Sequence, residues 1–201
     1  MDLPRNIHAL KSIYEVYWTT QNFLDFDDYY EIYASELADE IEEFRVRSTM
    51  CADCYHRGLK ARIYRTWASL LTQIYGGYLA QVVFGAGSVA MSEELDHNNI
   101  DIRVVYRGMT LNYQVKKESH RPEARTRVGS ARVNEGVNID LFYFVPPRTI
   151  FENPLKLNGQ PRAAYARFTE NSELWRLDNG FVLFHRSVFE KNKREIDLLS
   201  E

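Results

Sequence analysis

Two neighbouring stretches of the chain, on either side of Arg107-Gly108, alternate apolar and polar residues with the period of a β-strand. This pattern predicts a β-hairpin. A two-residue turn would place Tyr106 opposite Met109 and, further back, Asp101 opposite Gln114. The predicted apolar face consists of Ile100, Ile102, Val104 and Tyr106 on the first strand and Met109, Leu111, Tyr113 and Val115 on the second.

Apolar residues recur every three to four positions in two other stretches, from Phe26 to Phe44 and from Lys60 to Phe84, which predicts amphipathic helices. Residues 1–56 read as a mostly helical lobe. The pair Gly76-Gly77 inside the second helix favours close approach of another segment, either a strand or a partner subunit.

The remaining segments predict strands and helices in mixed order. Asp140 lies inside an apolar strand, and a buried carboxylate needs a partner, which we expect to be an arginine of the preceding loop. The order favours an α/β (α+β) fold in a single domain, with residues 57–201 as a core around a central mixed β-sheet flanked by helices. The predicted segments are strands at Ser88–Met91, Val137–Val145 and Phe181–Phe184, and helices at Ala163–Leu177 and from Glu190.

Composition narrows the class of protein. The 201 residues are 45% hydrophobic, which is typical of a globular chain. No apolar run approaches the roughly 20 residues of a membrane span, and the N-terminus lacks the apolar region of a signal peptide, so we expect a cytoplasmic protein with no membrane partner. The net charge of −3 does not indicate a nucleic-acid partner, but the charge distribution suggests a basic working face, which would attract an anionic partner, and an acidic far side. Gln21 to Phe44 holds nine acidic and no basic residues, whereas Asp101 to Arg132 holds eight basic and three acidic ones.

Candidate chemistry gathers on the polar face of the hairpin, where Asp101, Gln114 and Lys116 converge. Mg²⁺ prefers oxygen ligands, which Asp101, the Val115 carbonyl and the Gln114 amide would supply. Lys116 would orient or deprotonate a water at the metal, or stabilise charge developing on a phosphate. Asp96 would either cap a turn in the D-H-N-N cluster or serve as a helper carboxylate. The spacing fits a metal-dependent phosphodiesterase.

Simpler interpretations stand beside these. Asp and Lys on one face of a half-exposed hairpin often form only a solvated surface or a weak ion pair. The acidic helix is best interpreted as a solvated surface. Cys51-Ala-Asp-Cys54 with His56 resembles part of a zinc site, but these are the only two cysteines, so an incidental reduced pair is the better reading.

A basic segment follows the hairpin. Arginine and lysine make most protein contacts to DNA phosphates, and arginine also reads guanine in the major groove. A loop of this composition directly after a catalytic strand is well placed to contact DNA, although a solvated loop is the alternative. The candidate DNA-contact residues are Lys117, Ser119, Arg121, Arg125, Arg127 and Arg132.

Two longer strings, R-I-Y-R-T-W-A-S-L-L-T-Q-I-Y-G-G-Y (Arg62 to Tyr78) and Q-V-K-K-E-S-H-R-P-E-A-R (Gln114 to Arg125), resemble the TaqI-type restriction endonucleases. These belong to the PD-(D/E)XK nuclease superfamily, and the resemblance covers residues 60–185. Gln114 stands where the superfamily usually has Asp or Glu, although the TaqI-type string also has Gln. The core helix offers Gln73 and Gln81 instead of the carboxylate that some superfamily members contribute.

The resemblance implies a homodimeric type II restriction endonuclease that uses Mg²⁺ to cut double-stranded DNA at the palindrome TCGA and leaves 5′ overhangs. It also implies a prokaryotic host and a DNA methyltransferase that protects the host DNA. Asp101, Gln114 and Lys116 take the metal and catalytic roles, with Asp96 as a helper, and the sequence does not decide between Lys116 and Lys117 as the principal lysine. A repair or structure-specific nuclease, or a non-catalytic DNA-binding protein, stays open.

Overall fold

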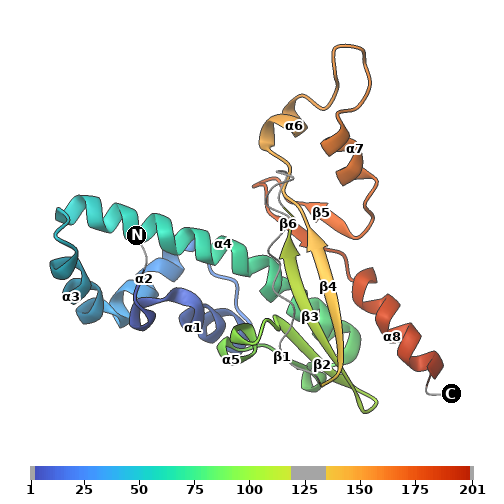
Figure 1. Ribbon diagram of the computed structural model, residues 1–201, viewed down its shortest axis with the longest axis horizontal. Coiled ribbons are helices and arrows are strands. Elements are labelled where there is room, and N and C mark those ends of the chain that lie inside the picture. The colour runs from blue at the N-terminus through green and yellow to red at the C-terminus, as the bar shows by residue number, and fades with distance from the viewer. Residues whose placement is uncertain (1–2, 119–134, 200–201) are drawn as a thin grey trace. The chain divides into compact units, whose positions relative to one another are not determined.

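The computed structural model describes residues 3–118 and 135–199 (Figure 1). The chain forms two compact units, Met1–Ile74 and Tyr75–Glu201, and the boundary between them falls inside one long helix, α4 (Ala52–Phe84). The single domain with a lobe ending at residue 56 remains a prediction. No helix among the described residues is long and apolar enough to cross a membrane.

The first unit is helical throughout its regular elements, as the sequence predicts. A side-chain cap starts α2, where Asp25 Oδ1 accepts a 3.0 Å hydrogen bond from the backbone N–H of Asp28. The elements before α4 are the 3₁₀ helix η1 (Arg5–Ile7), α1 (Ala9–Ile13), the π-helical η2 (Tyr14–Thr19), α2 (Phe26–Glu36) and α3 (Ala38–Ser48).

The predicted continuous helix from Phe26 to Phe44 is wrong in one respect. Leu37 adopts φ −114° and ψ 25°, outside the helical region, and this divides the segment into α2 and α3. The acidic residues lie mainly on the exposed sides of both helices, so the prediction of a solvated acidic surface is confirmed.

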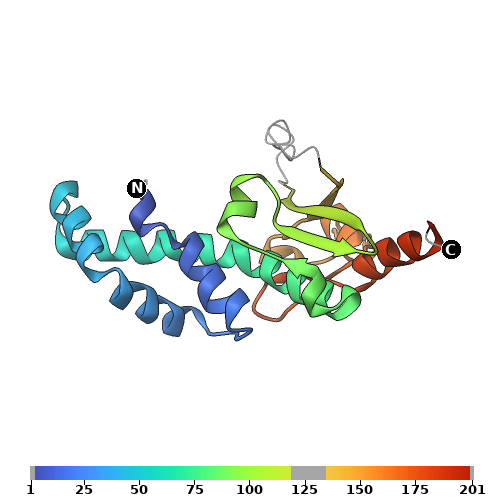
Figure 2. The same ribbon diagram turned by 90° about the horizontal axis from the view of Figure 1, so that it is seen from below.

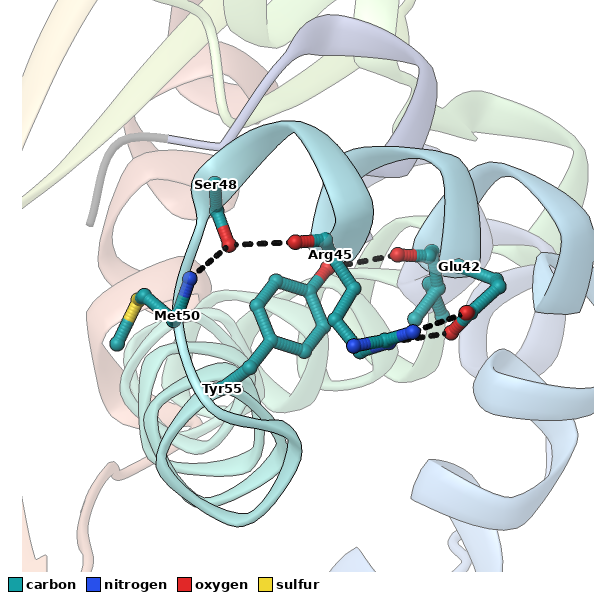
Figure 3. A network of polar contacts seen from close by, with 6 residues as sticks. Glu42, Arg45, Ser48, Met50 and Tyr55 are labelled. Carbon is teal, nitrogen blue, oxygen red and sulfur yellow. Dashed lines mark hydrogen bonds and ion pairs between the residues drawn. The ribbon is translucent and has the colours of Figure 1, made fainter.

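Buried aromatic side chains hold the first unit together by donating hydrogen bonds across it. Tyr33 Oη donates to the carbonyl of Ile7 at 2.5 Å, and Trp67 Nε1 donates to Tyr17 Oη at 2.6 Å. In Figure 2, α2 runs alongside the first part of α4. Figure 3 shows Tyr55 of α4 below α3, where its hydroxyl donates to the Ile41 carbonyl at 3.0 Å. These bonds satisfy polar atoms that packing alone would leave buried without partners.

The second unit is built on a four-stranded sheet in the order β1-β2-β3-β4. The predicted hairpin is confirmed: β2 and β3 pair antiparallel with Tyr106 opposite Met109. Arg107 and Gly108 both have positive φ, 49° and 78°, as a type I′ turn requires. β4 pairs parallel to β3, so the sheet is mixed. The strands are β1 (Val89–Ala90), β2 (Ile102–Tyr106), β3 (Met109–Lys117) and β4 (Val137–Tyr143).

Helices cover the apolar face of this sheet. A Cβ added to Gly76 of α4 would lie 3.2 Å from Ile102 Cδ1, so the glycine permits the close approach of a strand that the sequence suggests. The ring of Phe189 in α8 (Ser187–Leu199) packs 5.2 Å from that of Tyr113. The same helix donates from Asn192 Nδ2 to Tyr113 Oη at 3.1 Å.

Two segment predictions near the C-terminus need correction. The helix expected at Ala163–Leu177 ends at Thr169, and Leu174–Arg176 instead forms strand β5, which pairs with β6 (Val182–Phe184). β4 is not buried on both faces, because alternate side chains along it are exposed. The other short elements are η3 (Ala86–Ser88), α5 (Glu93–His97), α6 (Arg148–Glu152) and α7 (Ala163–Thr169). The predicted mixed α/β fold with a mixed sheet flanked by helices is confirmed.

Candidate active site

Asp101 lies directly before β2, and its carboxylate is fixed by the neighbouring strand. Its backbone N–H donates to the Tyr113 carbonyl at 2.9 Å, which extends the hairpin ladder by one bond. The N–H of Val115 donates to Asp101 Oδ2 at 2.6 Å. Asp101 is only 6% exposed, so the carboxylate is held inside the protein surface with a defined orientation.

Burial, helped by the nearby Asp96 carboxyl, raises the pKa of Asp101 to about 7. The hydrogen bond from Val115 and the charge of Lys116 act in the opposite direction. Asp96 lies in α5, where Ser92 Oγ caps the helix by accepting from the N–H of Leu95 at 3.2 Å. The turn expected around Asp96 is therefore wrong for this residue. The structure brings the two carboxyl groups within hydrogen-bonding reach of each other.

Gln114 lies on β3 between Tyr113 and Val115, the two residues whose backbone groups bond to Asp101. Its Oε1 atom is buried and accepts no hydrogen bond from any of the described residues. A buried amide oxygen without a partner costs roughly 1–3 kcal/mol, so such an atom in a folded protein calls for an explanation. A cation bound beside Asp101 would supply the missing partner.

Lys116 shares the face of Gln114, and its side chain is only 11% exposed. Its Nζ lies 2.5 Å from Asp140 Oδ2 on β4. Among the described residues the partner of Asp140 is Lys116, because the parallel pairing of β3 with β4 brings these two side chains together. The arginines of the preceding loop, one of which was the expected partner, lie outside the described residues. Lys117 is exposed and, by the alternation of the strand, points to the opposite face.

The donor set suits a hard divalent cation. Asp96 and Asp101 interact with each other, Gln114 follows on β3, and oxygen ligands of this kind are what Mg²⁺ prefers. The described residues contain no group of three or more His, Cys, Asp or Glu side chains that could hold a metal ion. The remaining ligands would therefore come from the amide oxygen, the Val115 carbonyl, water and substrate.

A row of polar side chains that was not predicted as part of the site continues along the same sheet face. Arg103 Nε donates to Asn112 Oδ1 at 3.0 Å, and Asn112 Nδ2 donates to the Glu135 carbonyl at 2.8 Å. Residues two apart in a strand share a face, so the sequence already predicts that Arg103 lies on the face of Asp101, and this could have pointed to the row. The role of Asp140 as a partner of Lys116 needed the β3–β4 pairing and could not be read from local pattern.

Of the predicted DNA-contact residues, the structure describes only Lys117. Lys117 is described and exposed. The other candidates lie outside the described residues: Ser119, Arg121, Arg125, Arg127 and Arg132.

The possible zinc ligands lie at the start of α4, in the other unit. Cys51 and Cys54 are free and exposed, and the backbone N–H of Cys54 donates to Cys51 Sγ at 3.2 Å.

Comparison with known proteins places the chain in a family. The family model described as TaqI restriction endonuclease matches residues 1–196. The chain belongs to the TaqI restriction endonuclease family. The type II restriction enzyme TaqI of Thermus aquaticus is 30% identical over 196 residues, covering 92% of this chain and 73% of the relative. The type II restriction enzyme TthHB8I of Thermus thermophilus is 30% identical over 201 residues, with the same coverage. No solved structure matches the chain.

The family match confirms the resemblance and extends it. The resemblance covers residues 60–185, whereas the family model also includes the N-terminal helices. Family membership makes the chain a type II restriction endonuclease, an enzyme class that cuts double-stranded DNA at specific sites. The predicted enzyme class is therefore confirmed.

Proposed function

We propose that the chain is a Mg²⁺-dependent type II restriction endonuclease with a PD-(D/E)XK-like core, and that it hydrolyses phosphodiester bonds at the palindrome TCGA to leave 5′ overhangs. The observation that carries the metal part of this proposal is the pair formed by Asp101 and Gln114. Asp101 is a buried carboxylate with a pKa raised to about 7, and it is hydrogen-bonded to the two neighbours of Gln114, whose buried amide oxygen has no partner among the described residues. A divalent cation would favour the ionised carboxylate and satisfy the amide at once.

Each residue of the site has a role that follows from its position. Asp101 and Asp96 would hold the cation, with the Gln114 amide and the Val115 carbonyl as further oxygen ligands. Mg²⁺, when bound, stabilises the negative charge that develops on the phosphate. The Lys116 ammonium donates hydrogen bonds to a phosphate oxygen or orients the attacking water. The hydrogen bond from Val115 keeps the Asp101 carboxylate aimed without any rearrangement during the reaction.

The site sequence, the assembly and the biological setting are proposed from the family. A palindromic site suits a two-fold dimer in which each subunit cuts one strand, so we propose a homodimer. Ser119 to Arg132 would contact DNA together with Lys117. A paired DNA methyltransferase would protect the host genome in a prokaryotic cytoplasm.

The experiment that tests the metal site compares Asp101→Ala with the wild-type protein on DNA that the wild type cuts. We expect Asp101→Ala to abolish cleavage in Mg²⁺ while DNA binding, measured by gel shift without metal, persists. Asp178→Ala is the matched control, because Asp178 is an exposed carboxylate in a turn of the same unit. Cleavage by Asp101→Ala at the wild-type rate would refute the assignment of this site.

A further inference from the structure

Strand β4 supplies two groups that confine the side chain of Lys116. Asp140 Oδ2 lies 2.5 Å from Lys116 Nζ, and the centroid of the Phe142 ring lies 5.8 Å from the same nitrogen. The parallel register sets Gln114 beside Asp140 and Lys116 beside Phe142. The lysine therefore reaches back along the sheet toward the row that contains Gln114, and stops at Asp140.

The ion pair between Lys116 and Asp140 contributes little to the free energy of unfolding. The Asp140 side chain is 43% exposed, and ion pairs with an exposed partner contribute only about 0–1 kcal/mol because water screens them. Its effect on geometry is larger. A free lysine side chain carries about 2 kcal/mol of rotamer entropy, so a fixed carboxylate at its tip selects one position from many. That position lies on the face that holds Gln114, and the charge of Lys116 acts on the Asp101 carboxyl.

We propose that Asp140 is the positioning residue for Lys116 during DNA cleavage. Its carboxylate holds the ammonium group of Lys116 at the height of the Asp101–Gln114 pair, so that the group is in place when a phosphate arrives. Asp140 acts through Lys116 and does not touch the reacting atoms. This inference rests on the proposed function, because it assigns a partner to a lysine of that site.

Two other roles for Asp140 make different predictions. If Asp140 were a metal ligand, raising the Mg²⁺ concentration would restore the activity lost on its removal. If Asp140 repelled or contacted DNA, its removal would change DNA affinity, and loss of a carboxylate tends to strengthen binding to a polyanion. A positioning residue changes the rate of cleavage of bound DNA at every Mg²⁺ concentration and does not weaken binding.

The test measures single-turnover cleavage of duplex DNA at saturating enzyme, across a range of Mg²⁺ concentrations, together with the dissociation constant for the same DNA. We expect Asp140→Ala and the isosteric Asp140→Asn to cleave about 10- to 100-fold more slowly than the wild type, because loss of a residue that orients an active group typically has an effect of this size. Neither variant should bind DNA more weakly. Asp140→Glu, which keeps a carboxylate, should cleave faster than both.

Glu152→Ala serves as the matched control, because it removes the partner of Arg148 in an exposed ion pair at 2.7 Å. It should cleave at the wild-type rate. Equal thermal unfolding of all variants excludes a loss of fold. Wild-type cleavage by Asp140→Ala, recovery at high Mg²⁺, or a Glu variant as slow as Ala would overturn the inference alone. If the wild type cuts without Mg²⁺, or Asp101→Ala still cuts, the proposed function falls and the inference falls with it.

Discussion

The backbone N–H of Val115 donates a 2.6 Å hydrogen bond to Oδ2 of Asp101, which links the two strands of the hairpin through a carboxylate. The donor of this bond is on β3, the strand that also carries Gln114 and Lys116, so that strand fixes the orientation of the Asp101 side chain. The hairpin segment thus supplies Asp101, Gln114 and Lys116, and their geometry depends on the pairing of its strands.

The raised pKa of Asp101 predicts how stability changes with pH in the absence of metal. Because the folded-state pKa of about 7 exceeds the unfolded value of 3.8, the folded protein binds the proton more tightly. This contribution to stability is fully present below pH 4 and is lost as pH rises through 7. Asn stays neutral at every pH. We therefore expect Asp101→Asn to be more stable than the wild type at pH 8, with a free energy of unfolding about 2 to 4 kcal/mol higher.

At pH 4 the two proteins should differ by less than about 1 kcal/mol, because Asp101 is then protonated in the folded protein and close to half protonated in the unfolded chain. Denaturant melts in EDTA at the two pH values measure this difference. Equal stabilities of the wild type and Asp101→Asn at pH 8 would show that the carboxyl group is not forced to ionise in a buried site.

Gln114 sets the strength of the proposed metal site. A carboxylate binds a divalent cation more strongly than an amide, and the charge of the ligands tunes affinity. We expect Gln114→Glu to lower the Mg²⁺ concentration for half-maximal cleavage about tenfold, and Gln114→Ala to raise it. Titration of the cleavage rate with Mg²⁺ measures both. An unchanged midpoint in both variants would remove Gln114 from the ligand set.

In the first unit, the hydroxyl of Tyr33 is expected to stabilise the fold. It is fully buried and donates at 2.5 Å to the carbonyl of Ile7. Tyr33→Phe would leave that acceptor without this partner and should lower the free energy of unfolding by about 1 to 3 kcal/mol. Tyr64→Phe is the control, because Tyr64 is 46% exposed, and its effect should be near zero. Urea melts compare the two, and equal effects would contradict the role of the buried bond.

The cysteine pair is expected to be dispensable. Cys51 and Cys54 are exposed, and zinc sites of the structural kind need about four ligands. A Cys51→Ser, Cys54→Ser double variant should unfold at the wild-type temperature, and neither protein should carry zinc after purification. Elemental analysis and a thermal melt measure this. Stoichiometric zinc in the wild type, lost in the double variant, would establish the alternative.

The hairpin could be predicted because its evidence is local. Apolar and polar residues alternate along the strands that contain Ile102 and Tyr113, and Gly108 allows the positive φ of the turn. Both signals come from consecutive residues. The placement of Asp101 opposite Gln114 stays a prediction, because the observed pairing ends at Ile102 and Tyr113. The long helix was also predictable, although it starts at Ala52, earlier than the apolar pattern indicates.

What could not be predicted depends on partners distant in sequence. Asp140 meets Lys116 only because β4 pairs parallel to β3, and no local pattern fixes which strand lies beside which. Strand β5 was mistaken for the end of a helix because Leu174–Arg176 is too short for its periodicity to be informative. The break at Leu37 involves neither Gly nor Pro, so the sequence carried no signal for it.

The most direct test of the account is to incubate the protein with long unmethylated DNA, with and without Mg²⁺, and to sequence the ends of the fragments. The account predicts cleavage only with Mg²⁺, and fragment ends that all converge on TCGA with 5′ overhangs. Scattered ends would contradict a restriction endonuclease and indicate a repair-type nuclease. Intact DNA in Mg²⁺, despite binding in a gel shift, would contradict a catalytic role for the hairpin.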